Sequence, residues 1–263
     1  ETFIDDSIMN STGSRRDSFS QFGNISKNLA LASIPFGLSA LANKAIAKDI
    51  TPTPATPIGA LQFALTLEYL ENEFYAMALD SGVIPALENG GRDLKVFQQI
   101  AAHESSHVKF LIAGLGGSAS ANFVPKPTFD FTVGGTFDPF HDYPTFLALA
   151  QAFEDTGVRA YKGQAANLIT TPDLLTAALQ IHSVEARHAS EVRRLRKLKG
   201  WISNADRGAG MPPATQAVYD GEGVTNQAGF NTAAAFGASA GSEAYDEALT
   251  TQQVVDIANI FIV

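Results

Sequence analysis

The sequence contains no cysteine among its 263 residues. Disulfide bonds and thiolate metal ligands are therefore excluded, so any metal site in this chain must be built from carboxylates and imidazoles. Oxygen-rich ligation of that kind favours iron or manganese over zinc or copper(I).

Positive charge is also scarce, with 18 lysines and arginines against 27 aspartates and glutamates and a net charge of −9. Such an acidic chain argues against nucleic acid and anionic lipid surfaces as partners. No apolar run reaches the ~20 residues of a membrane-spanning helix, so no transmembrane span is expected. With 45% hydrophobic residues, the chain is long enough for one sizeable domain with appendages.

What the sequence does contain is a Glu-x-x-His spacing that occurs twice, as Glu104 with His107 and Glu185 with His188. On a helix, residues three apart share a face, with their Cβ atoms about 5–6 Å apart. A glutamate lies one helix upstream of each motif. This is the ligand set of a carboxylate-bridged di-metal centre in a four-helix bundle. The candidate ligands are Glu68, Glu104, His107, Glu154, Glu185 and His188.

The two motifs look like copies of one duplicated helix pair. The upstream glutamates lie 86 residues apart and the motifs 81 residues apart, and a tyrosine, Tyr75 or Tyr161, follows each upstream glutamate by seven residues. Ile100, Glu104 and His107 also fall on the apolar stripe that should face a bundle core. Buried carboxylates need a partner or a metal. Hydrogen bonding among these groups alone is the weaker alternative.

Some residues near the motifs are ambiguous. Glu71 falls on the same stripe as Glu68, at the place that Gly157 takes in the second half, and could be an extra carboxylate beside the metals. Glu73 should point to solvent. We expect Tyr75 and Tyr161 to pack in the core with their hydroxyls bonded to a polar group. The alternative is that they support the metal ligands by hydrogen bonds or take part in radical chemistry. The other histidines, His103, His141 and His182, are predicted not to be ligands.

Helix signals indicate an all-α fold with four bundle helices and one long connection. The connection, rich in glycine, proline and phenylalanine, joins the second helix to the third and is long enough to cross the bundle, which is the ferritin-like arrangement. The predicted helices are residues 57–80, 92–113, 144–170 and 171–197. The basic run that ends the fourth helix complements the helix dipole.

The appendages lie before and after this bundle. We predict an N-terminal arm with a proline linker at residues 1–51, the bundle at residues 52–200 and a C-terminal extension at residues 201–263. Residues 200–249, with eight glycines, are typical of an irregular wrap with little helix. A capping box of Thr250 and Gln253 should then start a final helix, whose apolar end would be buried on the bundle or on a partner chain.

Two segments carry a family resemblance. Residues 67–75 (LEYLENEFY) and 245–250 (YDEALT) resemble motifs of the ferritin-like proteins often described as desiccation-related, and the resemblance covers roughly residues 52–263. It implies a ferritin-like bundle and, by analogy with the wider superfamily, two metal ions. It implies no substrate, because that superfamily spans several chemistries.

The N-terminal arm contains Ser-Arg-Arg-Asp-Ser-Phe at residues 14–19, followed by a weakly apolar stretch at residues 28–43. The first segment resembles the twin-arginine export motif, and the second suits a signal peptide. We therefore expect export to the periplasm or cell surface. The leader could be cleaved at Ala45-Ile46-Ala47 or retained as an amphipathic helix or arm. An ordinary arginine pair in an arm that binds a partner or a second copy of the chain is the alternative.

Three functions are compatible with these patterns. The first is a di-iron or di-manganese protein, an oxidoreductase of peroxidase or catalase type, that acts on oxygen or peroxide in stress protection. The second is a structural subunit of an envelope or larger complex, in which the N-terminal arm and C-terminal helix make the contacts and the metal site is static or vestigial. Metal storage is the third and weakest, because long appendages would obstruct a cage.

Overall fold

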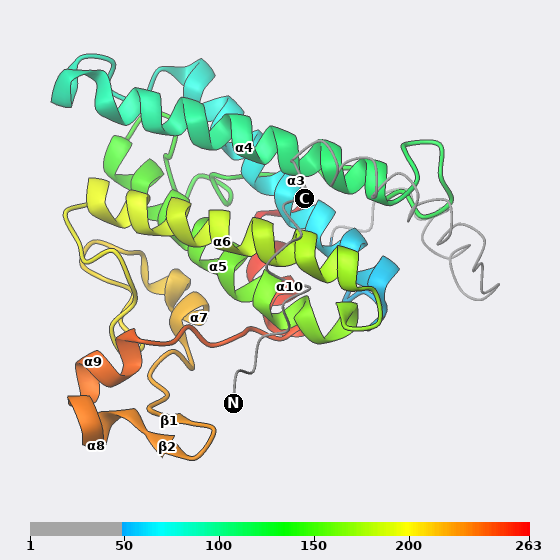
Figure 1. The fold of residues 1–263 in the computed structure, drawn as a ribbon. Helices are drawn as coiled ribbons and strands as arrows, with labels where there is room; N and C mark the ends of the chain where they lie inside the picture. Colours follow the sequence, from blue (N-terminus) through cyan, green and yellow to red (C-terminus); the bar gives the residue numbers. More distant parts are fainter. Residues whose placement is uncertain (1–48) are drawn as a thin grey trace.

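The computed structural model describes residues 49–263, and its centre is a bundle of four long helices (Figure 1). Helix α3 packs along α4, and α5 packs along α6. Residues 115–142 connect the two pairs, and a short 3₁₀ turn, η2 (Glu88–Gly91), lies between α3 and α4. The prediction of an all-α bundle with one long crossover between its second and third helices is confirmed. The helices are α3 (Pro57–Ser81), α4 (Arg92–Gly114), α5 (Tyr143–Gln164) and α6 (Pro172–Leu195).

Local signals set the helix boundaries. The Thr56 side chain accepts a 3.1 Å hydrogen bond from the Gly59 amide, and a proline follows it at the first helical position. Such a cap satisfies one of the amides that a helix start leaves without a partner. Gly82 ends α3 with φ of 73°, a left-handed conformation that glycine adopts without strain. Asp142 caps α5 in the same way through the amide of Thr145, at 2.9 Å.

Helix α5 ends earlier than predicted. We expected one helix to residue 170, but α5 stops at Gln164 and a 3₁₀ turn, η3 (Ala165–Leu168), follows. The Thr171 amide and hydroxyl both donate to the Leu168 carbonyl, at 2.8 and 3.0 Å. Pro172 has no amide hydrogen to continue a helix, so the chain turns here and α6 begins.

The C-terminal extension contains more regular structure than its glycine content indicates. Short helices and a small antiparallel hairpin gather to one side of the bundle (Figure 1). Thr250 and Gln253 form the predicted capping box at the start of the final α-helix. The elements are η4 (Pro213–Thr215), α7 (Gln216–Tyr219), β1 (Asn226–Gln227), β2 (Phe230–Asn231), α8 (Thr232–Phe236), α9 (Ala238–Glu243), α10 (Thr251–Ala258) and η5 (Asn259–Phe261).

Buried charges on α5 hold this extension in place. Arg159, only 1% exposed, donates to the Glu247 carbonyl at 2.7 Å and the Asp220 carbonyl at 3.0 Å, and its Nε lies 2.6 Å from Glu222 Oε1. Asp155 pairs with Arg193 of α6 at 2.6 Å. Helix α5 is therefore covered on its outer face as well as its inner one.

The crossover and the end of the chain also pair with each other. The Asp130 amide donates to the Phe261 carbonyl at 2.8 Å, and the Val263 amide donates to the Thr128 carbonyl at 3.1 Å. The rings of Phe153 and Phe261 meet edge to face, 4.9 Å between centroids. Phe261 and Ile262 are therefore buried on the bundle of their own chain, one of the two placements expected, whereas Ile260 and Val263 remain exposed.

None of the helices within residues 49–263 is long and apolar enough to cross a membrane. The twin-arginine-like motif at residues 14–19, the apolar stretch at residues 28–43 and Ala45-Ile46-Ala47 lie outside the described residues.

Candidate metal centre

All four bundle helices contribute to one buried polar group at the centre of the bundle. Helix α3 supplies Glu68, α4 supplies Glu104 and His107, α5 supplies Glu154, and α6 supplies Glu185 and His188. The four glutamates have no exposed surface, and the two histidines are also buried. The structure thus brings together all six residues that the sequence singled out.

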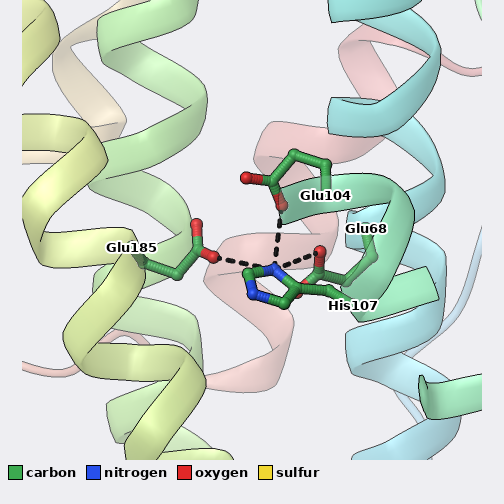
Figure 2. A group of neighbouring side chains, drawn as sticks. All are labelled: Glu68, Glu104, His107 and Glu185. Carbon is green, nitrogen blue, oxygen red and sulfur yellow. Dashed lines mark hydrogen bonds and ion pairs between the residues drawn. The ribbon is translucent and has the colours of Figure 1, made fainter. Parts of the chain in front are cut away.

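These six residues form two overlapping sets of four. One set contains Glu68 and His107, the other contains Glu154 and His188, and both share Glu104 and Glu185. Within each set, one ligand atom from each residue lies within 4.8 Å of every other. Figure 2 shows three carboxylates of the first set pointing toward the ring of His107. Its Nδ1 lies 3.0 Å from Glu104, 3.2 Å from Glu68 and 3.3 Å from Glu185.

The second set holds polar atoms that are buried without a hydrogen-bond partner among the described residues. His188 Nδ1 lies 2.9 Å from Glu104 Oε1 and 3.2 Å from Glu154 Oε2, but neither contact has hydrogen-bond geometry. Both oxygens of Glu185 are also without a partner. Each such atom costs about 1–3 kcal/mol, and a bound cation would satisfy several at once. The donor set therefore fits a metal ion, with carboxylates and imidazoles as the available ligands.

Charge balance points the same way. Burial raises the pKa of Glu185 well above its ordinary range, and repulsion from Glu104 adds to the effect. Burial alone would lower the pKa of His188. The charge of Glu154 and the close contacts of Glu104 and Glu154 instead raise this pKa to about 11. Without a cation, these carboxylates must share protons or repel one another. Divalent ions would remove that conflict.

Two tyrosines connect the halves of this group. Tyr75 on α3 donates a 2.5 Å hydrogen bond to Glu154 on α5, and Tyr161 on α5 donates a 2.5 Å bond to Glu68 on α3. Both are buried, and the ring of Tyr75 stacks on Phe97 with centroids 5.9 Å apart. The expected core packing and a polar hydroxyl partner are both present, and that partner is a candidate ligand in each case.

Glu71 lies beside the group but in neither set of four. It is 4% exposed, and it faces the helix position of Gly157. A Cβ added to Gly157 would lie 3.2 Å from Glu71 Oε1 and 3.0 Å from Glu185 Oε2. The glycine therefore leaves room for a fifth carboxylate. Burial raises the pKa of Glu71 well above its ordinary range, and repulsion from the charge of Glu185 raises it further.

His103 has a contact that the sequence analysis missed. Its Nδ1 lies 2.9 Å from Nε2 of His188, on the side of that ring away from the carboxylates. Its Nε2 lies 2.7 Å from the Gln99 side chain. His103 is not in either set of four, as predicted, but it supports one of their members. The sequence signal that could have indicated this contact is the position of His103 next to Glu104.

The remaining candidates lie elsewhere. His182 contacts the Val158 carbonyl at 3.1 Å, and His141 pairs with Asp138 at 2.7 Å in the exposed crossover. Glu73 pairs with Lys126 at the surface. None of these side chains joins either set of four.

A family model described as a ferritin-like domain matches residues 56–198, which span all four bundle helices and the crossover. No curated protein matches the chain.

Proposed function

The chain belongs to the ferritin-like domain family, and on that premise we propose that its bundle holds two iron or manganese ions and acts on oxygen or peroxide in stress protection. The observation that carries the proposal is the convergence of buried, partnerless ligand atoms from Glu104, Glu154, Glu185 and His188. The resemblance of residues 67–75 and 245–250 supports placement among the desiccation-related members of that family.

Each helix pair would supply three of the six ligands. Glu68 and His107 would hold one ion, Glu154 and His188 the other, and Glu104 and Glu185, which belong to both sets, would serve both ions. Bound iron or manganese supplies the capacity to exchange electrons with oxygen or peroxide.

The surrounding residues would orient these ligands and keep bulk water out. Tyr75 and Tyr161 each direct one oxygen of a glutamate and leave the other for the centre. Apolar clusters built around Phe97 and Leu111 cover the group on its two sides along the bundle. Low polarity around the site strengthens every electrostatic contact within it.

Small cavities next to the centre favour a small substrate. One lies beside Tyr161 and another beside Glu71 and Gly157, and each has a volume of about 20 Å³. A volume of that order admits about one water-sized molecule. It suits a molecule of the size of oxygen or peroxide.

Elemental analysis of the protein purified without chelator tests the proposal. We expect about two equivalents of iron or manganese per chain, because the donor set serves two ions. The Glu104→Ala/Glu185→Ala variant should lose both. Glu73→Gln, changed on α3 but outside the group, should load as the wild type does. A folded wild-type chain that stays empty after anaerobic ferrous loading would contradict the proposal.

Peroxide turnover separates an oxidoreductase from a structural subunit with a static site. Oxygen evolution or peroxide loss by the loaded wild type, absent from Glu104→Ala/Glu185→Ala, would support the enzyme. A fully loaded protein that consumes neither oxygen nor peroxide would favour the structural subunit.

Export is a further part of the proposal, supported by the sequence at residues 14–19. Replacing Arg15 and Arg16 with lysine should retain the protein in the cytoplasm, because an ammonium group does not reproduce the planar, multi-donor guanidinium. Unchanged cell fractionation of that variant would show that the arginine pair is part of an ordinary arm.

A further inference from the structure

The two halves of the metal centre are related by reciprocal contacts. Tyr75 of the first half bonds Glu154 of the second, and Tyr161 of the second bonds Glu68 of the first. The two sets of four ligands are likewise exchanged when the halves are exchanged. A contact in one half therefore has an equivalent position in the other, which can be found by the offset of 81 residues between the two motifs.

On the outer side of the two histidine rings, one contact of His188 has no counterpart at His107. His103 Nδ1 bonds Nε2 of His188 at 2.9 Å. The equivalent contact would join residue 184 to His107, but residue 184 is valine and offers no hydrogen bond. Among the described residues, no side chain or carbonyl bonds Nε2 of His107. The side chain of His107 is also more exposed than that of His188, 11% against 5%.

We infer that the two metal positions are unequal and fill in order, with the position of His188 binding its ion more tightly because His103 positions that ring. The inference rests on the proposed two-ion centre. With Nδ1 of His188 turned to the carboxylates, its Nε2 hydrogen donates to His103 and fixes both the tautomer and the orientation of the ring. Outer partners of this kind change metal affinity by about 10- to 100-fold.

The neighbours of His103 allow it to accept that hydrogen bond. Its own Nε2 faces the Gln99 side chain at 2.7 Å, whose amide offers a donor or an acceptor depending on its rotation. The structure places the Gln99 amide nitrogen at this position, so when His103 accepts at Nδ1 the Gln99 amide must rotate for its oxygen to accept the Nε2 hydrogen. The chain Gln99–His103–His188 thus runs from the surface to the centre with every partner satisfied.

Cobalt(II) titration of the full-length apoprotein, followed by calorimetry and by visible absorption, tests the inference. The wild type should bind two equivalents in two distinguishable steps. In His103→Val the first step should weaken by about 10- to 100-fold while the second stays unchanged. In Val184→His the second step should tighten, because the missing partner of His107 is restored.

His182→Val is the matched control, since His182 bonds a backbone carbonyl and no candidate ligand. It should titrate as the wild type does. Thermal unfolding of each apoprotein separates lost positioning from lost folding.

Two equal steps in the wild type, or an unaltered first step in His103→Val, would overturn the inference while leaving the two-ion centre in place. A second step unchanged by Val184→His would contradict the role given to residue 184. A wild-type chain that binds no cobalt would instead contradict the proposed function itself.

Discussion

The hydroxyl of Tyr161 donates to Glu68 at 2.5 Å across 93 residues of sequence, and that of Tyr75 donates to Glu154 at 2.5 Å across 79. Each tyrosine thus fixes a carboxylate that belongs to the other helix pair. Neither pair alone contains a complete set of four ligands, so the centre exists only when both pairs have docked.

Replacing either tyrosine with phenylalanine should weaken metal binding. Tyr161→Phe leaves the ring in place but removes the donor that orients Glu68, and Tyr75→Phe does the same to Glu154. We expect a loss of about tenfold in affinity, the lower end for a residue that hydrogen-bonds a metal ligand, measured by competition with a chelator. Tyr69→Phe is the control, because its hydroxyl donates to the Val124 carbonyl at 3.3 Å and, among the described residues, to no candidate ligand. An equal loss in all three variants would assign the effect to packing.

Glu68→Ala should reduce metal occupancy far more than Glu71→Ala. Glu68 belongs to a set of four ligand atoms and Glu71 to none. Elemental analysis of both variants, purified side by side, measures the difference. Equal losses would mean that both carboxylates bind metal, and the opposite order would overturn the pairing of Glu68 with Glu154.

Gly157→Ala should disturb the centre while keeping the helix. The added Cβ would lie 3.0 Å from Glu185 Oε2 and 3.2 Å from Glu71 Oε1, closer than ordinary contact, so both carboxylates must move. We expect weaker metal binding with a far-ultraviolet circular dichroism spectrum like that of the wild type. The loss should shrink when Glu71→Ala is added. Full metal loading of Gly157→Ala would show that the carboxylates relax freely.

Asp155→Ala should destabilise the fold by about 3–5 kcal/mol, because it leaves Arg193 buried without its charged partner. It also removes the acceptor of the Tyr219 hydroxyl, at 2.8 Å. Glu191→Ala breaks an exposed pair with Arg92 and should cost about 0–1 kcal/mol. Urea unfolding measures both. Similar costs for the two variants would show that the Asp155 pair is not buried in solution.

The stability of the protein should fall between about pH 4.5 and pH 7 through Glu222. Burial raises the pKa of this carboxyl from 4.5 to about 7, even though Arg159 opposes the shift. The folded state therefore holds a proton that the unfolded state releases across this range, and stability is lost as pH rises. Urea midpoints of wild type and Glu222→Gln, compared from pH 4 to pH 8, should converge at low pH and separate above it. Parallel curves would contradict the assignment.

The bundle and its six convergent residues could be predicted because their signals are local. Helical periodicity alone puts Glu104 and His107 on one face, and caps such as Thr56 mark where the helices begin. The duplication identified the two upstream ligands, because a tyrosine follows Glu68 and Glu154 at the same spacing. The same comparison made Gly157 the counterpart of Glu71 in the second half; their proximity in space is a finding of the structure.

Other features depend on how the helices are rotated against one another, which the sequence does not encode locally. His103 lies about 100° around the helix from Glu104, so its contact with His188 follows only from the relative rotation of α4 and α6. Likewise, Arg159 binds carbonyls some 60–90 residues away. Only the folded chain shows that the extension covers α5.

The backbone pairing between the crossover and the C-terminal segment has a consequence for local unfolding. Ile257, Ala258 and Phe261 close the cavity that reaches Glu71 and Gly157, and two backbone hydrogen bonds tie this segment to residues 128–130. If α10 and η5 detach before the four long helices separate, that cavity opens, and the free energy of this partial opening then sets how often solvent reaches Glu71. Amide exchange in α10 reports it directly.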